Sequence, residues 1–366
     1  MQLPYEEELE IGYLSRLFDK TSECYKFFWF KAILKKIREG RDNFTYEELV
    51  DEMIADAWYM VSEYHLNLGP KDNLESVVNY IVQANSFKPS EKNSEILKYL
   101  KSGADSEVMR MKKILIKNVP YRLLSPFMPD VKGKELEGSM VKRIKIINKQ
   151  ERLLYNIGYY NGLDTKIYIM PEWYLYIRKN MEIIKGWLEY KMIVYLQKRN
   201  PNVPGIADKL YPPQERNLPE IRNYWKMIME FQPIHEIYGN NELDSEKISI
   251  DHFVPWSYVA HDELWNLHPT TARINSSKSN KLPDWNIYFP LLARLQYLSY
   301  QMIWKYDRIH DEFDKCAKEH LNNDDIRYRL YRNGLSKEEF FHQLNDTIHP
   351  VYDSAKNSGF ANWIYK

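Results

Sequence analysis

The chain has 366 residues, of which 44% are hydrophobic and 28% are charged; this length exceeds the size at which one hydrophobic core usually stops growing, so we expect several domains. The composition excludes a disordered chain, and no apolar run approaches the roughly 18 residues of a membrane-spanning helix, so we expect a cytoplasmic protein without a membrane partner. The 51 basic residues equal the 51 acidic ones, which excludes a protein that coats DNA indiscriminately and predicts nucleic-acid contacts that are local or helped by a partner.

Cysteine usage limits the metal chemistry. Cys24 and Cys316 are far apart in the sequence, and neither belongs to a CxxC pair. A disulfide scaffold and a thiolate zinc site are therefore excluded, and no structural zinc is expected. Any metal ion must be held by oxygen and nitrogen atoms. The acidic start MQLPYEEELE lacks the basic and apolar regions of a signal peptide, so we expect no export.

The first 130 residues have a helical pattern and predict a helical domain. Four apolar residues share one helix face at three- and four-residue steps: Phe30, Ile33, Leu34 and Ile37. Thr45 and Glu48 have the spacing of a capping box and predict a helix through residue 61, and Asp72 with Glu75 predicts another helix start. No glycine-rich loop of the GxGxxG or GxxxxGKS/T type occurs, so nucleotide binding by such a loop is not supported.

Residues 110–152 carry an uneven charge, with twelve basic residues against four acidic ones, an excess of eight. One interpretation is a track for backbone phosphates, because lysine and arginine release counterions from DNA, and the other is a solvated helix surface. In the first interpretation Lys142, Arg143 and Lys145 bind nucleic acid. The twelve basic residues are Arg110, Lys112, Lys113, Lys117, Arg122, Lys132, Lys134, Lys142, Arg143, Lys145, Lys149 and Arg152.

Residues 131–230 are predicted to combine this basic segment with a short β-hairpin and long helices. The hairpin is expected within residues 153–170, because Asn161-Gly162 is a favoured tight-turn pair and the segment Lys166–Met170 is rich in strand-type residues.

Helices dominate the rest of this segment. One long helix is expected from Pro171 through Tyr195, and a further helix over residues 218–231. The proline- and glycine-containing range 200–213 between them is the best candidate for a linker.

The region after residue 290 is predicted to be helical and to pack on the module that precedes it. Apolar residues follow three- and four-residue steps and predict one long amphipathic helix, with Tyr306 keeping the register. Ser336 and Glu339 predict the cap of a last helix through Leu344. The apolar residues of the long helix are Leu291, Leu295, Leu298, Met302, Ile309, Phe313 and Cys316.

The stretch from residue 248 to 283, ISIDHFVPWSYVAHDELWNLHPTTARINSSKSNKLP, concentrates residues that carry chemistry. Asp251 and His252 end a predicted strand, Asn266 enters a second strand after a loop, and a helix follows that carries Asn275 and Lys278. A metal-ligand type, a candidate base and a cation thus come from three different segments. The fold class predicted from the whole chain is mainly α, with a small ββα module over residues 231–290.

This stretch resembles the HNH nuclease motif, also called ββα-metal or His-Me finger, in the variant with asparagine as the final letter. His252 and Asn266 are 14 residues apart and Asn266 and Asn275 nine apart, which is similar to the HNH domain of RNA-guided CRISPR effector nucleases. Lys278 and Pro283 complete the likeness. Only about 40 to 50 residues are covered, and the flanking helical regions resemble no family.

The resemblance implies a role for each matched residue. Asp251 and Asn275 would hold Mg²⁺ or Mn²⁺ through oxygen atoms, which these ions prefer. His252 would act as the general base that takes a proton from water. Asn266 would brace the loop and orient His252, and Lys278 would reach a phosphate oxygen.

Other polar residues near the motif have different interpretations. We expect His268 and His261 to pack or lie at the surface rather than to bind metal. Three further residues are secondary candidates for contacts with substrate or a second ion: His235, Asp262 and Glu263.

The implied function is a metal-dependent endonuclease that hydrolyses phosphodiester bonds in DNA rather than RNA, with 5′-phosphate and 3′-hydroxyl products. Because one such site cuts one strand at a time, double-strand cleavage requires a homodimer or two successive nicks. By analogy the biological role is bacterial restriction or anti-phage defence. The alternative is a catalytically inactive HNH fold that serves as a nucleic-acid-binding or assembly module of a defence complex.

Overall fold

The computed structural model describes residues 2–19, 21, 23–70, 72–85, 87–131, 133–212 and 218–366. The chain divides into two compact units. The first unit comprises Met1–Pro201 and Leu210–Pro212, and the second comprises Asn202–Lys209 and Pro213–Lys366. The chain thus passes between the units within the range predicted to be a linker, although Pro213 at its end lies outside the described residues.

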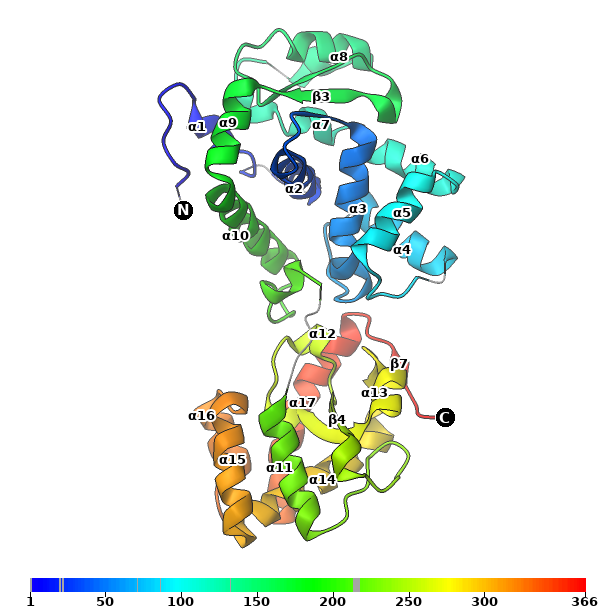
Figure 1. Cartoon of the computed structure of the whole chain (residues 1–366), viewed down its shortest axis with the longest axis vertical. Helices are drawn as coiled ribbons and strands as arrows, with labels where there is room; N and C mark the ends of the chain where they lie inside the picture. Colours follow the sequence, from blue (N-terminus) through cyan, green and yellow to red (C-terminus); the bar gives the residue numbers. More distant parts are fainter. Residues whose placement is uncertain are drawn as a thin grey trace. The chain divides into compact units, whose positions relative to one another are not determined.

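The first unit is mainly helical and carries a small sheet (Figure 1). Its elements are α1 (Ile11–Ser15), α2 (Tyr25–Arg38), β1 (Asn43–Thr45), α3 (Tyr46–Ser62), α4 (Asn73–Ala84), α5 (Asn93–Ser102), α6 (Ser106–Leu115), α7 (Val119–Arg122), η1 (Ser125–Phe127), η2 (Gly133–Leu136), α8 (Met140–Ile147), β2 (Tyr155–Ile157), η3 (Gly162–Asp164), β3 (Lys166–Ile169), α9 (Pro171–Lys179) and α10 (Met181–Arg199). The short turn η4 (Asp208–Leu210) lies where the chain passes from the second unit back to the first.

Local sequence signals fix the helix starts in this unit. The Thr45 side chain accepts a hydrogen bond from the Glu48 amide while Glu48 caps the Thr45 amide, so the predicted capping box is confirmed at the start of α3. Asp72 caps α4 by accepting from two backbone amides. The four apolar residues predicted to share a face of α2 are all buried. This helix packs its aromatic side chains into the core, where the ring of Phe27 lies 4.3 Å from that of Phe18.

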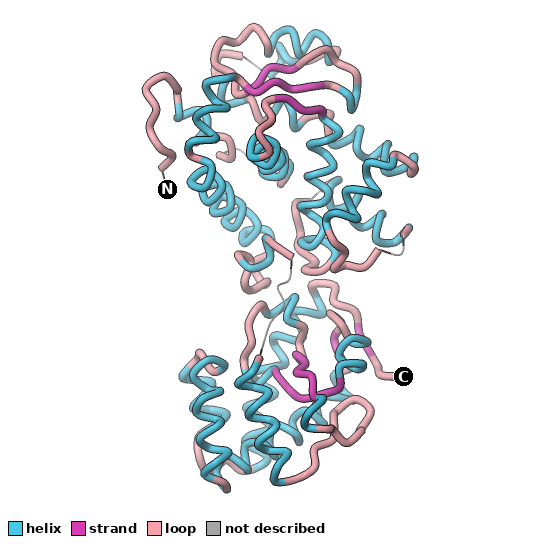
Figure 2. The backbone as a smooth tube through the Cα atoms, viewed as in Figure 1, coloured by secondary structure: helices cyan, strands magenta, loops and turns pink. Residues whose placement is uncertain are grey.

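The predicted hairpin is confirmed, and the structure adds a third strand to it. Strands β2 and β3 pair antiparallel, with Tyr155 opposite Ile169. Strand β1 pairs with the other edge of β3, which gives the order β1-β3-β2. Figure 2 shows these strands at one end of the helices of the first unit. Because β1 comes from a distant part of the chain, the local hairpin pattern could not reveal it.

The single long helix predicted from Pro171 through Tyr195 is wrong, because α9 and α10 are separate helices. Asn180 between them has φ −112° and ψ 21°, which lie outside the helical range. Asparagine favours such positions because its side chain competes for backbone groups; here its amide donates to the carbonyl of Tyr176 at 3.0 Å.

The second unit is also mainly helical and carries two small sheets. Its elements are α11 (Pro219–Phe231), η5 (Ser245–Lys247), β4 (Ile248–His252), α12 (Trp256–Val259), η6 (Leu264–Asn266), β5 (Leu267–Thr271), α13 (Ala272–Lys278), β6 (Leu282–Pro283), α14 (Trp285–Lys305), α15 (Asp307–His320), α16 (Asp324–Tyr331), α17 (Lys337–Asn357) and β7 (Asn362–Trp363). The mainly α fold class with an embedded ββα module is therefore confirmed.

The prediction of one long helix after residue 290 is also wrong. The helix breaks at Tyr306, which has the extended angles φ −132° and ψ 118° and separates α14 from α15. The Tyr306 ring lies 4.4 Å from the ring of Phe231 at the end of α11. The break therefore brings α15 beside α11, a tertiary contact that overrides the continuous apolar pattern.

The last helix begins as predicted, with a capping box between Ser336 and Glu339, but it runs on to Asn357 instead of ending at Leu344. No helix among the described residues is long and apolar enough to cross a membrane.

Candidate active site

Strands β4 and β5 and helix α13 form a ββα arrangement around the polar residues of the central stretch. The strands pair antiparallel, with Asp251 opposite His268. Thr271 caps α13 by accepting a hydrogen bond from a backbone amide in its first turn. Asn275 and Lys278 are three residues apart on α13 and therefore share a face, which lies against β4.

Asp251 is buried, and both of its carboxylate oxygens accept hydrogen bonds. Lys278 Nζ donates to Oδ1 at 3.1 Å, and the Tyr238 hydroxyl donates to Oδ2 at 2.8 Å. His268 Nε2 lies 3.6 Å from Oδ2. A buried carboxylate is costly unless it is paired and hydrogen-bonded, and these neighbours satisfy both oxygens of Asp251 in the interior.

Lys278 points inward in the structure and not toward solvent, where the predicted phosphate would bind. It is 0% exposed, and its Nζ also donates to the carbonyl oxygen of His252 at 2.6 Å. Burial lowers the pKa of Lys278, and the Asp251 carboxylate opposes this shift. Lys278 thus fixes the carboxylate and the backbone of the Asp-His pair at the same time.

Tyr238 reaches Asp251 from a loop that the sequence did not single out. The buried carboxylate of Glu236 organises this loop by accepting from the backbone amides of Tyr238 (2.7 Å), Gly239 (2.9 Å) and Asn241 (3.1 Å). Charge-assisted bonds of this kind are stronger than neutral ones. Glu236 therefore holds the Tyr238 hydroxyl against the strand.

His252 is held by a carboxylate. Its Nε2 lies 2.7 Å from Asp262 Oδ1, and Asp262 belongs to the loop between the two strands. The backbone oxygen of Asp262 contacts His320 Nδ1 at 2.8 Å, which ties this loop to the end of α15. A carboxylate beside one ring nitrogen favours the tautomer that carries its proton on that nitrogen.

Asn266 bridges the backbone of the same loop. Its side-chain amide donates to the Val254 carbonyl and accepts from the Val254 amide, both at 2.8 Å. The Phe253 amide donates to the Asn266 carbonyl at 2.8 Å. The asparagine is fully buried and contacts the backbone just after His252, but it makes no direct hydrogen bond to the His252 side chain among the bonds described.

His268 is enclosed beside this cluster. Burial lowers the pKa of His268 to about 4, so the ring is neutral near pH 7. Its Nε2 lies 3.2 Å from the Tyr238 hydroxyl. The residue is thus neither at the surface nor a simple packing residue: it is a polar neighbour of the two groups that surround Asp251.

The donor atoms in this cluster fit a divalent ion such as Mg²⁺. Ser249 and Asp251 are two residues apart on β4 and so face the same side. The Asn275 amide nitrogen donates to Ser249 Oγ (2.9 Å) and to the Ile250 carbonyl (3.0 Å), which leaves its Oδ1 as the candidate ligand on that side. In the part of the chain that the structure describes, no three His, Cys, Asp or Glu side chains form a metal cluster. An ion would therefore draw on few protein oxygens and on water, as Mg²⁺ commonly does.

The predicted phosphate-binding residues of the basic segment lie in the first unit. Lys142 and Lys145 on α8 are exposed. Arg143 is partly committed to the fold, because its guanidinium donates to the carbonyl of Leu136 at 2.9 Å and lies 5.1 Å from the centre of the Tyr121 ring. Lys112 is fully buried and is therefore not a surface charge, and Lys132 lies outside the described residues.

The sequence analysis did not identify Tyr238 or His268 as part of this site, and it gave Asp262 only a secondary role. Tyr238 carried no signal, since nothing local relates it to a residue 13 positions away. His268 was set aside because a lone histidine is usually structural. Asp262 gave a weak signal, because it lies in the loop that follows His252.

A family model described as HNH endonuclease matches residues 235–284. The matched range includes Tyr238, both strands and α13. No curated protein and no solved structure matches the chain. The finer likeness to the HNH domain of CRISPR effector nucleases stays a prediction.

Proposed function

Because residues 235–284 form a domain of the HNH endonuclease family, we propose that this protein is a metal-dependent endonuclease that hydrolyses phosphodiester bonds in DNA. One observation carries the proposal. Asp251, His252 and Asn275 lie on a single ββα unit, and His252 is oriented by a carboxylate 2.7 Å away. A protein that only binds nucleic acid has no need for an oriented histidine beside oxygen ligands.

His252 is proposed to be the general base. With the Nε2 proton directed at Asp262, Nδ1 is the nitrogen that accepts a proton from the attacking water. The Asp262 carboxylate then stabilises the imidazolium that forms, because an adjacent negative charge favours the protonated ring. Asp262 is a positioning residue in this scheme, since it acts through His252.

Asp251 and Asn275 are proposed to hold the metal ion. When bound, Mg²⁺ or Mn²⁺ supplies positive charge that offsets the charge developing on the phosphate and on the leaving oxygen. In the structure Lys278 donates to Asp251. If an ion supplied the compensating charge, Lys278 would be the residue to contact a phosphate oxygen.

The products are proposed to be 5′-phosphate and 3′-hydroxyl ends. DNA is favoured over RNA by family analogy, and the exposed Lys142 and Lys145, with Arg143, are proposed to contact its backbone phosphates. A single site nicks one strand, so double-strand cleavage is assigned to a homodimer or a protein partner. A role in bacterial restriction or anti-phage defence rests on analogy alone.

A second candidate function follows from the contacts of Asp251. Both carboxylate oxygens already accept hydrogen bonds from side chains. If Lys278 is never displaced, the domain is an inactive HNH fold that binds nucleic acid or assembles a complex.

Plasmid nicking distinguishes the two functions. The full chain is incubated with supercoiled plasmid in Mg²⁺ or Mn²⁺, beside a His252→Ala variant and an EDTA control. We expect open-circular product from the wild type only, and a rate at least about 100-fold lower for His252→Ala, because a general base contributes about 10²–10⁴-fold.

The matched control is His342→Ala, which removes an exposed histidine of the same unit and should nick like the wild type. Equal nicking by wild type and His252→Ala would overturn the active-site assignment. Absence of nicking with either ion, while the plasmid is still bound, would support the inactive module.

A further inference from the structure

The carboxylate of Asp251 is held by two donors of different charge. On Oδ1 the donor is the ammonium group of Lys278, at 3.1 Å, and on Oδ2 it is the neutral hydroxyl of Tyr238, at 2.8 Å. His268 Nε2 lies 3.6 Å from the same Oδ2. The two oxygens of Asp251 therefore differ in the charge of the group that occupies them.

Three aromatic rings enclose the Tyr238 side chain. The ring centres of His268 on β5, Tyr288 on α14 and Trp363 on β7 lie 5.3, 5.1 and 5.0 Å from its own. Tyr238 and all three neighbours are buried. A close-packed interior leaves such a ring little room to turn. The hydroxyl is therefore held on Oδ2 by packing as well as by its hydrogen bond.

The turn after Tyr238 is also closed. Glu236 accepts hydrogen bonds from the backbone amides on both sides of this turn. A Cβ atom added to Gly239 would lie 2.7 Å from a ring carbon of Tyr365, and the Tyr365 amide donates to the Tyr288 hydroxyl at 2.9 Å. A shift of Tyr238 would thus have to break several contacts at once.

Lys278 differs from Tyr238 in charge and in flexibility. It is the last residue of α13, and its ammonium group ends a flexible four-carbon chain. A divalent cation at Asp251 would repel this ammonium group, but it would not repel a neutral phenol. The oxygen that a cation can take over is therefore Oδ1, while Oδ2 keeps its tyrosine donor.

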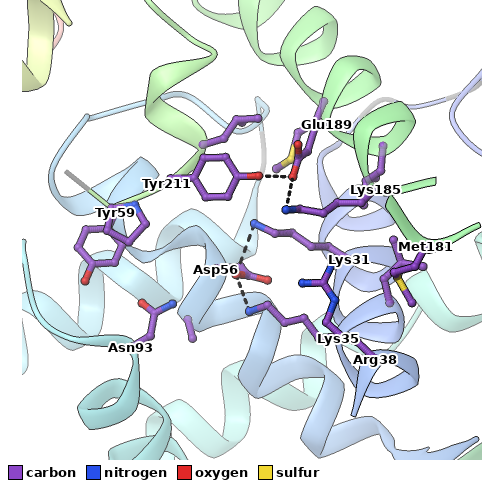
Figure 3. Close-up of a pocket in the computed structure, with 16 residues that line it drawn as sticks. Lys31, Lys35, Arg38, Asp56, Tyr59, Asn93, Met181, Lys185, Glu189 and Tyr211 are labelled. Carbon is purple, nitrogen blue, oxygen red and sulfur yellow. Dashed lines mark hydrogen bonds and ion pairs between the residues drawn. The ribbon is translucent and has the colours of Figure 1, made fainter. Parts of the chain in front are cut away.

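A pocket in the first unit offers a contrast (Figure 3). There Glu189 also has a lysine and a tyrosine neighbour, Lys185 and Tyr211, but both approach the same oxygen, Oε1. At Asp251 the cation and the neutral donor occupy different oxygens, so departure of the cation frees one oxygen and not both. The pocket lining includes three lysines from α2 and α10: Lys31, Lys35 and Lys185.

We propose that Tyr238 sets the ion selectivity of the nuclease site by limiting Asp251 to one available oxygen. This inference rests on the proposed function, in which Asp251 binds the ion. Ca²⁺ takes about six to eight oxygen ligands and often binds both oxygens of one carboxylate, whereas Mg²⁺ requires octahedral geometry and keeps several waters. A carboxylate with one available oxygen therefore suits Mg²⁺ or Mn²⁺ and disfavours Ca²⁺.

Ion binding by the full chain tests this selectivity. Bound Mn²⁺ is measured from the loss of the paramagnetic resonance signal of the free ion, and Mg²⁺ and Ca²⁺ are titrated as competitors. Tyr238→Phe removes only the hydroxyl and leaves Oδ2 without its donor. We expect the ratio of Ca²⁺ affinity to Mg²⁺ affinity to rise at least about fivefold, which is the size of one net hydrogen bond.

Tyr288→Phe is the matched control for this variant. It removes a buried hydroxyl of the same ring cluster, one that accepts from the Tyr365 amide, and it should leave the affinity ratio within about twofold of the wild type. Asp251→Asn should lower the Mn²⁺ affinity at least about tenfold, because it removes the charge of the proposed ligand. That loss assigns the measured binding to this aspartate.

Glu236→Gln carries the test if Tyr238→Phe does not fold, as judged by circular dichroism in EDTA. It weakens the acceptor for the Tyr238 backbone amide and keeps the hydroxyl, so the same ratio should rise by a smaller factor.

Two results would overturn the role of Tyr238 while wild-type nicking stays intact: an unchanged ratio in the variant that folds, or an equal rise in Tyr288→Phe. Binding of none of the three ions by the wild type would instead refute the metal site, and with it the metal dependence of the proposed function.

Discussion

The two units each bury a lysine against an aspartate, and the two ion pairs differ in the residues that surround them. In the first unit Lys112 lies 2.7 Å from Asp51 and donates to the Leu100 carbonyl at 2.9 Å. In the second, Lys278 lies 3.1 Å from Asp251 and donates to the His252 carbonyl at 2.6 Å. All four side chains are at most 4% exposed.

The difference lies in the neighbours of each pair. Lys112 has a second carboxylate neighbour, Glu47, at 3.1 Å. Its positive charge is therefore compensated by residues of the fold. Asp251 has instead a tyrosine hydroxyl and a neutral histidine, and it shares a strand face with Ser249, which holds Asn275. The first arrangement pairs one cation with two carboxylates, while in the second we propose that a metal ion can replace the lysine. Burial and pairing alone therefore do not identify a site.

Removing each lysine should cause the largest loss of stability, and the response to a metal ion should distinguish the two ion pairs. Lys112→Met and Lys278→Met each leave an uncompensated buried carboxylate, and we expect a loss of about 3–5 kcal/mol in the unfolding free energy of the unit concerned in EDTA. Mn²⁺ should restore about 2–3 kcal/mol in Lys278→Met at saturating ion, because binding stabilises the folded state, and nothing in Lys112→Met. Hydrogen exchange measured by mass spectrometry reports each unit separately. Equal recovery, or none in either variant, would contradict the metal site.

Lowering the pH should reduce the stability of the second unit and increase that of the first. His268 has a pKa of about 4 in the fold against about 6.5 when unfolded, so the unfolded chain binds the proton first and the second unit loses about 3 kcal/mol as pH falls from 6.5 to 4. Burial raises the pKa of Glu63 in the first unit to about 7. This group destabilises the fold when ionised, so its cost disappears as pH falls through 7 toward 4.5. As pH falls, hydrogen exchange corrected for its intrinsic rate should show the second unit unfolding before the first. His268→Gln should reduce the loss of stability of the second unit.

An asparagine bridges the amide and carbonyl of one residue in each unit, which allows a matched test of burial. Asn266 bridges Val254 through fully buried hydrogen bonds, and the exposed Asn148 bridges Ile157 through partly buried ones. Asn266→Ala should cost about 2 kcal/mol or more, because it leaves two buried backbone groups unsatisfied. Asn148→Ala should cost less than half of that, since water replaces the lost bonds. Urea denaturation with exchange detection measures both, and equal costs would show that the loop around His252 is not a sealed interior.

Asp262 offers a test of positioning in the second unit without loss of the base itself. Asp262→Asn should lower the nicking rate about tenfold, as is typical when a group that orients a functional residue is lost. It should also shift the rising limb of the pH–rate profile to lower pH, because a nearby carboxylate favours protonated His252. The matched control is Asp346→Asn, which alters an exposed histidine–carboxylate pair. A lower rate with an unchanged pH profile would indicate a structural role only.

The smallest effect is expected from the surface charge of the first unit. Lys142→Gln with Lys145→Gln should weaken DNA binding only several-fold at moderate salt and reduce the slope of log affinity against log salt by about two. Fluorescence anisotropy with a labelled duplex at several salt concentrations measures this slope. The control is Lys98→Gln with Lys101→Gln on α5. An unchanged slope would indicate that the basic segment is a solvated helix surface and does not bind phosphates.

Sequence patterns predicted the parts of the fold that depend on neighbouring residues. The capping residues Thr45 and Ser336 marked helix starts, and apolar spacing marked the buried face of α2. The same patterns failed at Asn180 and Tyr306, where the apolar period continues but the backbone leaves the helical conformation. At Tyr306 the helix break is matched by a contact with Phe231, 75 positions earlier, which no local pattern contains.

The central stretch shows the same division within one site. Its residue types and spacing were sufficient to recognise an HNH module, because the strand, loop, strand and helix are contiguous in the chain. The direction of each side chain was not predictable. Lys278 was expected at a phosphate, yet it faces Asp251 because α13 packs across β4.

The sequence by itself determined that the chain is mainly helical, that it carries an HNH module and which side chains could do its chemistry, since these follow from local propensity and spacing. Only the tertiary structure decided which of those side chains meet. It joined Tyr238 to Asp251, set Asp262 against His252, and gathered cations of α2 and α10 around one pocket. Such encounters depend on burial and on packing between distant elements, and their energies are absent from any short window of sequence.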